Sequence, residues 1–142
     1  MHLLMERVRM AVVSTESLPI KSEPDVVTVR RRVREVTAQL GFGLVDQTKV
    51  VTAASELARN TMIYGGGGVM SVETLNGPRT GIRLTFEDNG PGIADVEMAL
   101  RDGFTTGSGL GLGLGGSKRL VNDFQILSRV GQGTRVTITR WK

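Results

Sequence analysis

The sequence predicts a two-layer α/β (α+β) sandwich, in which a mixed β-sheet carries helices on one face. Segments with strand-like alternation lie at both ends and in the middle of the chain, and amphipathic helix patterns lie between them. The 142 residues, of which 39% are hydrophobic, are enough for one real core. No linker, internal repeat or low-complexity tail divides the chain, so a single domain over residues 1–142 is expected.

The first half of the chain is predicted to hold one strand and two helices. Apolar residues alternate with arginines within residues 4–13, which indicates a strand with one buried face. A serine, a proline and two acids at residues 22–25 are start signals for an amphipathic helix that ends at Gly41. A second helix is expected to open near Asp46. It must stop before residues 65–68, because consecutive glycines hardly form a helix.

The second half is predicted to consist mainly of strands. The expected strands are residues 69–75, 81–86, 124–130 and 134–141, each bounded by turn residues. A short helix is expected at residues 95–101. Residues 103–116 are rich in glycine and are expected to form a loop, and a helical turn at residues 117–121 leads away from it.

The composition excludes several kinds of site. The sequence has no cysteine, so disulfides, thiolate metal sites and a thiol nucleophile are ruled out. Its single histidine, His2, lies near the N-terminus, which argues against a histidine metal site, a catalytic triad and a histidine phosphoacceptor. No apolar run reaches the length of a membrane span, and no signal-peptide pattern is present. A cytoplasmic protein without a membrane partner is therefore expected.

The positive charge of the chain could indicate binding of nucleic acid or of an acidic protein. A net charge of +4 would permit nucleic-acid binding, but the basic residues are spread and aromatic residues make up only 4%. No nucleic-acid partner is therefore expected. The one dense basic run, Arg-Arg-Arg-Val-Arg at residues 30–34, fits either a solvated helix face or a docking surface for an acidic protein.

Three short motifs carry the functional prediction, and the first is Glu-Leu-Ala-Arg-Asn at residues 56–60. Glu56 and Asn60 are four residues apart on the second predicted helix, so their side chains point the same way. One interpretation is an ordinary exposed polar face. The chemical interpretation assigns Mg²⁺ to the amide oxygen of Asn60 and assigns Glu56 to polarising an attacking hydroxyl.

The second motif is Asp-Asn-Gly-Pro-Gly-Ile at residues 88–93, directly after a predicted strand. Asp88 would be a fixed acceptor at the mouth of that strand, suited to an exocyclic amine such as adenine N6. Gly90 and Gly92 would let the backbone approach the edge of a base closely. The alternative role of Asp88 is turn formation or capping.

The third motif is Gly-Leu-Gly-Leu-Gly at residues 109–113, within the glycine-rich run. Exposed N–H groups that lead into a helix make an anion site, and Lys118 could reach a phosphate as a point charge. The alternative is a flexible loop that binds nothing. The pattern is neither a Walker A loop nor a Rossmann fingerprint, and protein-kinase signatures such as His-Arg-Asp are absent.

In this order and spacing, the three motifs resemble the ATP site of the GHKL ATPase/kinase superfamily, which has the Bergerat fold. They are similar to its N box and its two glycine boxes, and Gly133-Thr134 is similar to the last element, whose threonine helps to hold the adenine region. The resemblance implies ATP and Mg²⁺ as cofactors, a glycine-rich lid, Glu56 as the catalytic residue and Asn60 as the metal ligand. The residues implied for cofactor binding are Asn60, Asp88, Gly90, Gly92, Ile93, Thr105, Thr106, Gly109, Leu110, Gly111, Leu112, Gly113, Lys118 and Thr134.

Finer details resemble the RsbT-like branch of small anti-sigma-type serine/threonine kinases. The segments that carry this likeness are residues 41–47, 102–106 and 118–124. Histidine kinases would need an upstream histidine helix pair, and gyrase, MutL and Hsp90 types would need a transducer domain. The resemblance implies phosphorylation of serine or threonine on a STAS-domain protein of a bacterial stress complex. It further implies release of the kinase to activate a PP2C-type phosphatase or its regulatory domain.

Two other hypotheses stay open at the level of the sequence. The protein could be an anti-sigma factor that sequesters a sigma factor and phosphorylates its antagonist, or a regulatory subunit that binds ATP but hardly hydrolyses it. The presence of both Glu56 and Asn60 argues against the second of these. Two features depart from the family pattern, namely the four glycines at residues 65–68 and the pair Gly115-Gly116, which is expected to make the base of the lid flexible. The oligomeric state is not written in the sequence.

Overall fold

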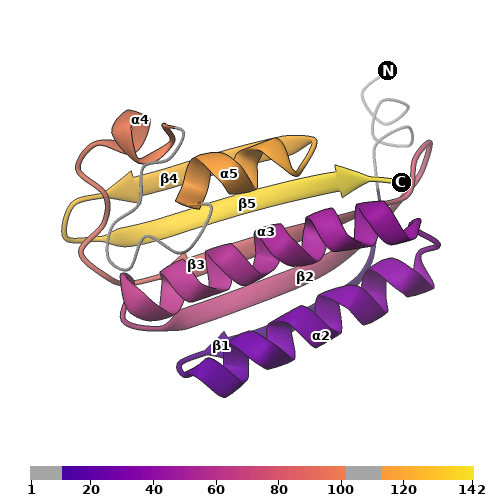
Figure 1. Ribbon diagram of the computed structural model, residues 1–142, viewed down its shortest axis with the longest axis horizontal. Helices are drawn as coiled ribbons and strands as arrows, with labels where there is room; N and C mark the ends of the chain where they lie inside the picture. The colour runs from indigo at the N-terminus through magenta and orange to yellow at the C-terminus, as the bar shows by residue number, and fades with distance from the viewer. Residues whose placement is uncertain (1–10, 102–112) are drawn as a thin grey trace.

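The computed structural model describes residues 11–101 and 113–142. The strands are β1 (Ala11–Ile20), β2 (Gly68–Asn76), β3 (Gly81–Asp88), β4 (Asp123–Arg129) and β5 (Gly133–Trp141). The helices within the described ranges are α2 (Glu23–Gln39), α3 (Leu44–Ile63), α4 (Val96–Ala99) and α5 (Gly113–Arg119). The strands form one five-stranded sheet, and α2, α3 and α5 cover one of its faces (Figure 1). The predicted two-layer sandwich is therefore confirmed.

The strand order is β1-β2-β3-β5-β4, and each neighbouring pair is antiparallel. The expectation of a mixed sheet is therefore wrong for the described strands. Helices α2 and α3 run in opposite directions and return the chain to the end of the sheet where β1 stops, so β2 runs back beside β1 (Figure 1). The pairs β2–β3 and β4–β5 are hairpins with short turns, which only antiparallel strands allow.

The first strand runs further along the chain than the sequence predicted. The described part of β1 extends to Ile20, whereas the expected strand covered residues 4–13, of which residues 4–10 lie outside the described part. β1 is at the edge of the sheet, and most of its side chains are exposed up to Ile20, which is fully buried. A strand with so few buried side chains lacks the alternation by which a strand is recognised.

The core lies between the helices and the inner face of the sheet. Both predicted helix patterns are confirmed, because α2 buries valines at three- and four-residue steps and α3 buries the apolar stripe that runs to Leu57. The sheet contributes Met70, Leu84, Phe86 and Ile138, each at most 2% exposed. Each such side chain stabilises the fold by roughly 1.5–3 kcal/mol relative to leaving it exposed.

Gly113, Gly115 and Gly116 lie in the first turn of α5, where the sequence predicted a loop. Gly115 is buried, and a Cβ atom on it would lie 2.2 Å from the carbonyl oxygen of Leu100. Glycine at this position therefore lets α5 pack directly on the backbone that follows α4. Packing outweighs the low helix propensity of glycine here, and the expected flexible base is instead a buried helical contact.

The other predicted elements are found with small shifts at their ends. β3 extends to Asp88, and the short helix expected at residues 95–101 is the single turn α4. Asp95 caps this turn, since its Oδ1 accepts a hydrogen bond of 2.9 Å from the Met98 amide. None of the helices in the described ranges is long and apolar enough to cross a membrane.

Candidate functional site

Segments that are far apart in the sequence meet at one end of the molecule. The last turn of α3, the end of β3 with the segment after it, and the β4–β5 turn all lie at this end (Figure 1). The Gly131 amide donates a hydrogen bond of 2.8 Å to the Pro91 carbonyl, which ties the β4–β5 turn to the second motif. Six of the predicted site residues lie outside the described part of the chain: Thr105, Thr106, Gly109, Leu110, Gly111 and Leu112.

Asp88 is the last residue of β3 and is half-buried. Its Oδ1 accepts a hydrogen bond of 2.9 Å from the Gly90 amide, so it forms the turn that was predicted as one of its two roles. Within the described part of the chain this is the only hydrogen bond of the carboxylate. The second oxygen, Oδ2, is therefore left to accept a bond from a ligand, and the two predicted roles are compatible.

Gly65 packs against Asp88 from the loop after α3. A Cβ atom on Gly65 would lie 2.4 Å from Asp88 Cγ, and one on Gly90 would lie 2.7 Å from Gly65 Cα. Gly68 is equally constrained, because its Cβ would lie 2.0 Å from the Glu87 carbonyl oxygen. Gly65 and Gly68 are thus required for packing at the end of β3, whereas Gly66 and Gly67 adopt positive φ values of 74° and 103°. The sequence showed the run but not its purpose, because Gly65 meets Asp88 only in the folded chain.

Asp88 belongs to a row of residues that face each other across three strands. Asp88 is opposite Thr134 on β5, and Thr134 is opposite Ser128 on β4. The oxygens Ser128 Oγ and Thr134 Oγ1 are 2.8 Å apart. Thr134 was predicted as a site residue, whereas Ser128 was missed. The only sequence signal for Ser128 is a polar residue in register with the inward-facing Phe124 and Ile126.

The second motif lies against the β4–β5 hairpin. Gly92 has a φ of 77°, and a Cβ atom on it would lie 2.2 Å from the Arg129 carbonyl oxygen, so glycine is required here. The next residue, Ile93, donates its amide to Ser128 Oγ over 2.8 Å. These contacts hold the loop after Asp88 in one position beside Thr134.

Glu56 and Asn60 lie in the second half of α3, on either side of the buried Leu57 and Ala58. Both side chains are half-buried, and neither has a hydrogen-bond or ion-pair partner among the described residues. The described residues also contain no group of three or more His, Asp or Glu side chains that could bind a metal. A cation beside Asn60 would therefore take most of its ligands from water and from a bound phosphate, as Mg²⁺ commonly does.

Lys118 and Gly113 lie at the two ends of α5. Gly113 has a φ of 70° and starts the helix, whereas Lys118 is exposed in its last turn. Figure 1 shows α5 running away from the end where the motifs meet, and Lys118 belongs to the last turn of this helix. At the C-terminal end of a helix a lysine also offsets the helix dipole.

The residues of the basic run 30–34 lie on different sides of α2. Arg30, Arg31 and Arg34 are exposed and have no ion-pair partner in the described ranges, whereas Val33 is fully buried. Arg32 turns back to β1 and lies 2.7 Å from Glu16 Oε1; this hydrogen bond raises the pKa of the guanidinium. The outward face of α2 thus presents three unpaired positive charges.

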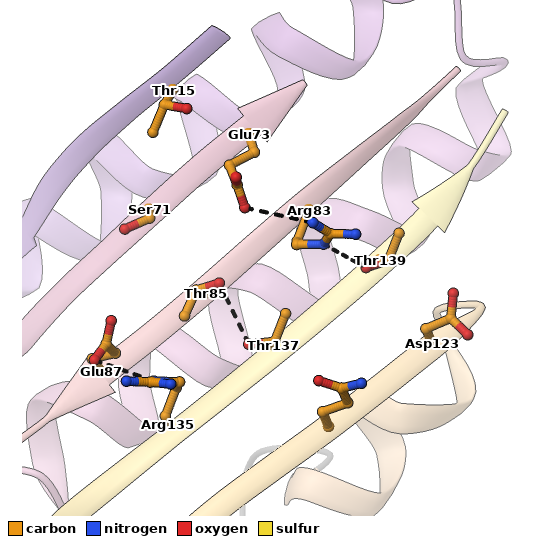
Figure 2. A pocket seen from close by; sticks show the side chains of 11 residues that line it. Thr15, Ser71, Glu73, Arg83, Thr85, Glu87, Asp123, Arg135, Thr137 and Thr139 are labelled. Carbon is orange, nitrogen blue, oxygen red and sulfur yellow. Dashed lines mark hydrogen bonds and ion pairs between the residues drawn. The ribbon is translucent and has the colours of Figure 1, made fainter. Parts of the chain in front are cut away.

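The opposite face of the sheet carries a hollow of about 580 Å³, which Figure 2 shows. Its walls are outward-facing polar residues of the strands, including the ion pairs Arg135–Glu87 at 3.3 Å and Arg83–Glu73 at 4.0 Å. None of the predicted site residues lines it. The hollow is therefore a feature separate from the row that contains Asp88.

Comparisons with known proteins identify the family to which the chain is similar. A family model described as histidine kinase-, DNA gyrase B-, and HSP90-like ATPase matches residues 45–142. The chain is 43% identical to a protein named serine/threonine-protein kinase RsbT from Bacillus subtilis, over 86% of this chain and 92% of the relative. It is 31% identical to an anti-sigma F factor from Anoxybacillus flavithermus, over 78% of this chain and 80% of the relative.

Solved structures show the same fold. The crystal structure of the RsbU and RsbW domains of a Mycobacterium tuberculosis protein matches with a TM-score of 0.62 at 21% identity, over 91% of this chain and 33% of that chain. The mycobacterial sensor histidine kinase MprB matches with a TM-score of 0.55 at 19% identity, over 90% of this chain and 97% of that chain.

Proposed function

Because this chain belongs to the family of histidine kinase-, DNA gyrase B- and HSP90-like ATPases and is a serine/threonine-protein kinase, we propose that it acts in a partner-switching pathway. Its substrate is a serine or threonine hydroxyl on a small STAS-domain antagonist protein. The observation that carries this proposal is the pair Glu56 and Asn60. These side chains are half-buried and unpartnered among the described residues, and they lie on the helix that ends beside Asp88.

The adenine end of the site is built on β3 and β5. Asp88 Oδ1 is occupied by the Gly90 amide, so Oδ2 accepts the exocyclic amine of the base. Gly90 and Gly92 let the loop after Asp88 pack closely on Gly65 and on the β4–β5 hairpin, which holds this loop beside Asp88. Thr134, directly opposite Asp88, lies beside the same ligand edge and contributes its hydroxyl.

The phosphate end of the site depends on α3 and on the glycine-rich segment. Asn60 holds Mg²⁺ through its amide oxygen, and when bound the ion neutralises charge on the transferring phosphate. Glu56 accepts the proton of the attacking hydroxyl. The residues proposed to bind the nucleotide beyond the base are Ile93, Thr105, Thr106, Gly109, Leu110, Gly111, Leu112, Gly113 and Lys118.

Release of the kinase follows from the reaction. Phosphorylation adds a charge of about −1.5 to −2 to the partner near neutral pH. In an interface that has formed around a neutral hydroxyl, this charge is repelled by nearby carboxylates and must be desolvated, so the complex weakens. The released kinase then binds and activates a PP2C-type phosphatase, through the phosphatase itself or its regulatory domain.

The test is phosphate transfer from radiolabelled ATP to a purified STAS-domain partner. Glu56→Gln is expected to keep ATP binding and to lower the transfer rate by about 10²–10⁴-fold, which is the usual contribution of a general base. Glu35→Gln, which changes an exposed glutamate on α2, serves as the matched control and should transfer at the wild-type rate. Full activity in the Glu56 variant would remove this residue from the chemistry.

An anti-sigma factor is the second candidate, and the similarity to an anti-sigma F factor favours it. Such a protein would use the same catalytic residues but would bind a sigma factor as its main act. Pull-downs with a STAS-domain protein, a sigma factor and a PP2C-type phosphatase separate the two candidates. Binding of the sigma factor alone would replace the first candidate by the second.

A further inference from the structure

The five-stranded sheet has two edges, β1 and β4, and they differ in how well they can pair with a further strand. β1 contains Pro19, and its register with β2 shifts between Val12 and Ser14. Natural sheets avoid edge-to-edge association in these two ways, because a proline or a bulge interrupts the row of N–H and C=O groups that an edge presents. The β1 edge is therefore poorly suited to take up another strand.

The β4 edge has neither of these features. Its seven residues, Asp123–Arg129, contain no proline, and they pair with β5 without a shift in register. Among the described strands, β5 is the one neighbour of β4. The loop after β3 contacts β4 at its last two residues, where Ile93 donates to Ser128 Oγ and Gly92 lies against the Arg129 carbonyl. Over the rest of β4, the outer N–H and C=O groups have no strand partner within the described structure.

The sequence of β4 is complementary to itself when two copies run antiparallel. Pairing two β4 strands about Ile126 places Asp123 of each copy opposite Arg129 of the other, and Ile126 opposite its own counterpart. Directly opposite residues lie on the same face of a sheet, and opposite charges in such pairs stabilise the pairing. Asp123 and Arg129 are both exposed, and neither has an ion-pair partner in residues 11–101 and 113–142.

The apolar side chains of β4 fit the same pairing. Phe124 and Ile126 pack against the core but are only half-buried. A second β4 strand covers the open side of Ile126 with an identical side chain. It also brings Leu127, which is 61% exposed, against Gln125 of the other copy. Removal of this apolar surface from water favours the association.

From these features we propose that the β4 edge is an interaction surface for a second copy of this chain. Two sheets join edge to edge into one antiparallel sheet, with a two-fold axis at Ile126. Inward-facing residues pair with inward-facing residues, so the helices of both copies cover the same face. Because Ser128 lies beside the candidate site and the two β4 strands run in opposite directions, the two sites lie on opposite sides of the axis. The contact is short, so the dimer is weak and depends on concentration.

Sedimentation equilibrium of the full chain without nucleotide, up to about 1 mM protein, tests the proposal. The wild-type protein should dimerise reversibly. Asp123→Arg places two arginines opposite each other at both ends of the contact, and Arg129→Asp does the same with two aspartates. Each substitution should therefore raise the dissociation constant at least about tenfold. Arg31→Asp makes the same charge change as Arg129→Asp at an exposed position of α2, and this control should dimerise like the wild type.

A charge swap separates a broken contact from a damaged fold. Asp123→Arg and Arg129→Asp are complementary to each other, so a mixture of the two variants should form heterodimers with about the wild-type affinity. The double variant Asp123→Arg/Arg129→Asp restores both pairs and should dimerise like the wild type, which also shows that the fold tolerates both changes.

Three results would overturn the proposal. The first is a wild-type protein that stays monomeric at about 1 mM. The second is a dimer that both single reversals leave unchanged, because the contact would then lie on another surface. The third is a mixture or double variant that fails to recover dimerisation, because the strands would then not pair about Ile126. Since no step uses a nucleotide, a wild-type protein that binds no ATP would contradict the proposed function alone.

Discussion

At the scale of single residues, the candidate site is defined by where side chains are missing as much as by where they are present. Gly65, Gly90 and Gly92 each lie so close to neighbouring atoms that a Cβ atom would overlap them. Within this close packing, the Gly90 amide donates a hydrogen bond to one carboxylate oxygen of Asp88. The other carboxylate oxygen is left to accept a hydrogen bond from a ligand. Substitutions at this end of the molecule should therefore separate the structural role of a residue from its role in binding.

Asp88→Asn is expected to preserve the turn and to weaken ATP. The asparagine carbonyl can still accept from the Gly90 amide, but its NH₂ group replaces the ligand-facing oxygen and would oppose the amine of adenine. ATP affinity should fall by about 1–3 kcal/mol, the cost of an unmatched polar group, with little change in the unfolding midpoint. Calorimetry and urea denaturation measure the two quantities. The matched control is Asp95→Asn, because Asp95 also accepts one backbone amide through Oδ1 but lies outside the proposed base contacts.

Gly65→Ala should displace the Asp88 carboxylate. The new Cβ would meet Asp88 Cγ at 2.4 Å, so either the side chain or the loop must move, at a cost of about 1–3 kcal/mol for overpacking. Both stability and ATP affinity are expected to fall. Gly43→Ala is the comparison, since nothing lies within 4 Å of its Cβ position, and it should cost at most about 1 kcal/mol as a change of helix cap. Wild-type affinity in Gly65→Ala would show that Asp88 can shift without loss.

At the scale of elements, periodic sequence patterns correctly predicted the two long helices. Local patterns did not predict elements whose structure depends on packing against distant parts of the chain. Valines at helical spacing on α2 were sufficient because burial imposes that period. For the edge strand β1 the predicted end was too early, and the glycine-rich start of α5 was predicted as a loop. The first buries few side chains, and the second depends on Leu100, which lies far along the chain from Gly115.

The same limit applies to the site. Asp88 and its glycines were found because they form a contiguous motif, and Thr134 was found through a family resemblance. Ser128 was not found, because its contact with Ile93 spans 35 residues and depends on strand register. The direction of strand pairing is likewise absent from any local pattern, which is why a mixed sheet was expected where the described pairs are antiparallel.

Gly115→Ala tests the contact between α5 and the chain after α4. At an exposed helical position alanine is about 1 kcal/mol more favourable than glycine. Here the added Cβ would lie 2.2 Å from the Leu100 carbonyl oxygen, so the substitution should destabilise the protein by about 1–3 kcal/mol instead. Urea denaturation measures the change. Thr52, exposed within α3, supplies the baseline, because Thr52→Ala should be more stable than Thr52→Gly. A stabilised Gly115→Ala protein would contradict the packing described.

At the scale of the whole molecule, the unpaired arginines and the candidate site residues lie on different parts of the described structure. The site residues lie at one end of the sheet, the unpaired arginines lie on the outer face of α2, and the polar hollow lies on the far face (Figures 1 and 2). A partner that reached both α2 and the end of α3 would have its hydroxyl at the site while its acidic groups meet the arginines. This layout is compatible with the docking interpretation of residues 30–34, and the test below separates it from a solvated face.

Changing Arg30, Arg31 and Arg34 together to alanine should slow association with a STAS-domain partner. Steering by exposed charges is screened by salt, so the loss should be large at low salt and small at high salt. Stopped-flow association at two salt concentrations measures it. Arg32→Ala is the control, since Arg32 is engaged by Glu16 and its loss should lower stability rather than the salt dependence. An unchanged salt dependence in the triple variant would favour the solvated-face interpretation.

The antiparallel register also decides where further protein could be attached. Ala11 is paired with Asn76 and Trp141 with Gly81, so the described N-terminal and C-terminal strand ends lie at the same end of the sheet. Asp88, Thr134 and Ser128 lie at the opposite end. A domain or a purification tag fused beyond Lys142 would therefore leave the sheet on the side away from the site. A fold laid out in this way can be reused as a module in longer chains, and the Mycobacterium tuberculosis protein with both RsbU and RsbW domains is one such chain.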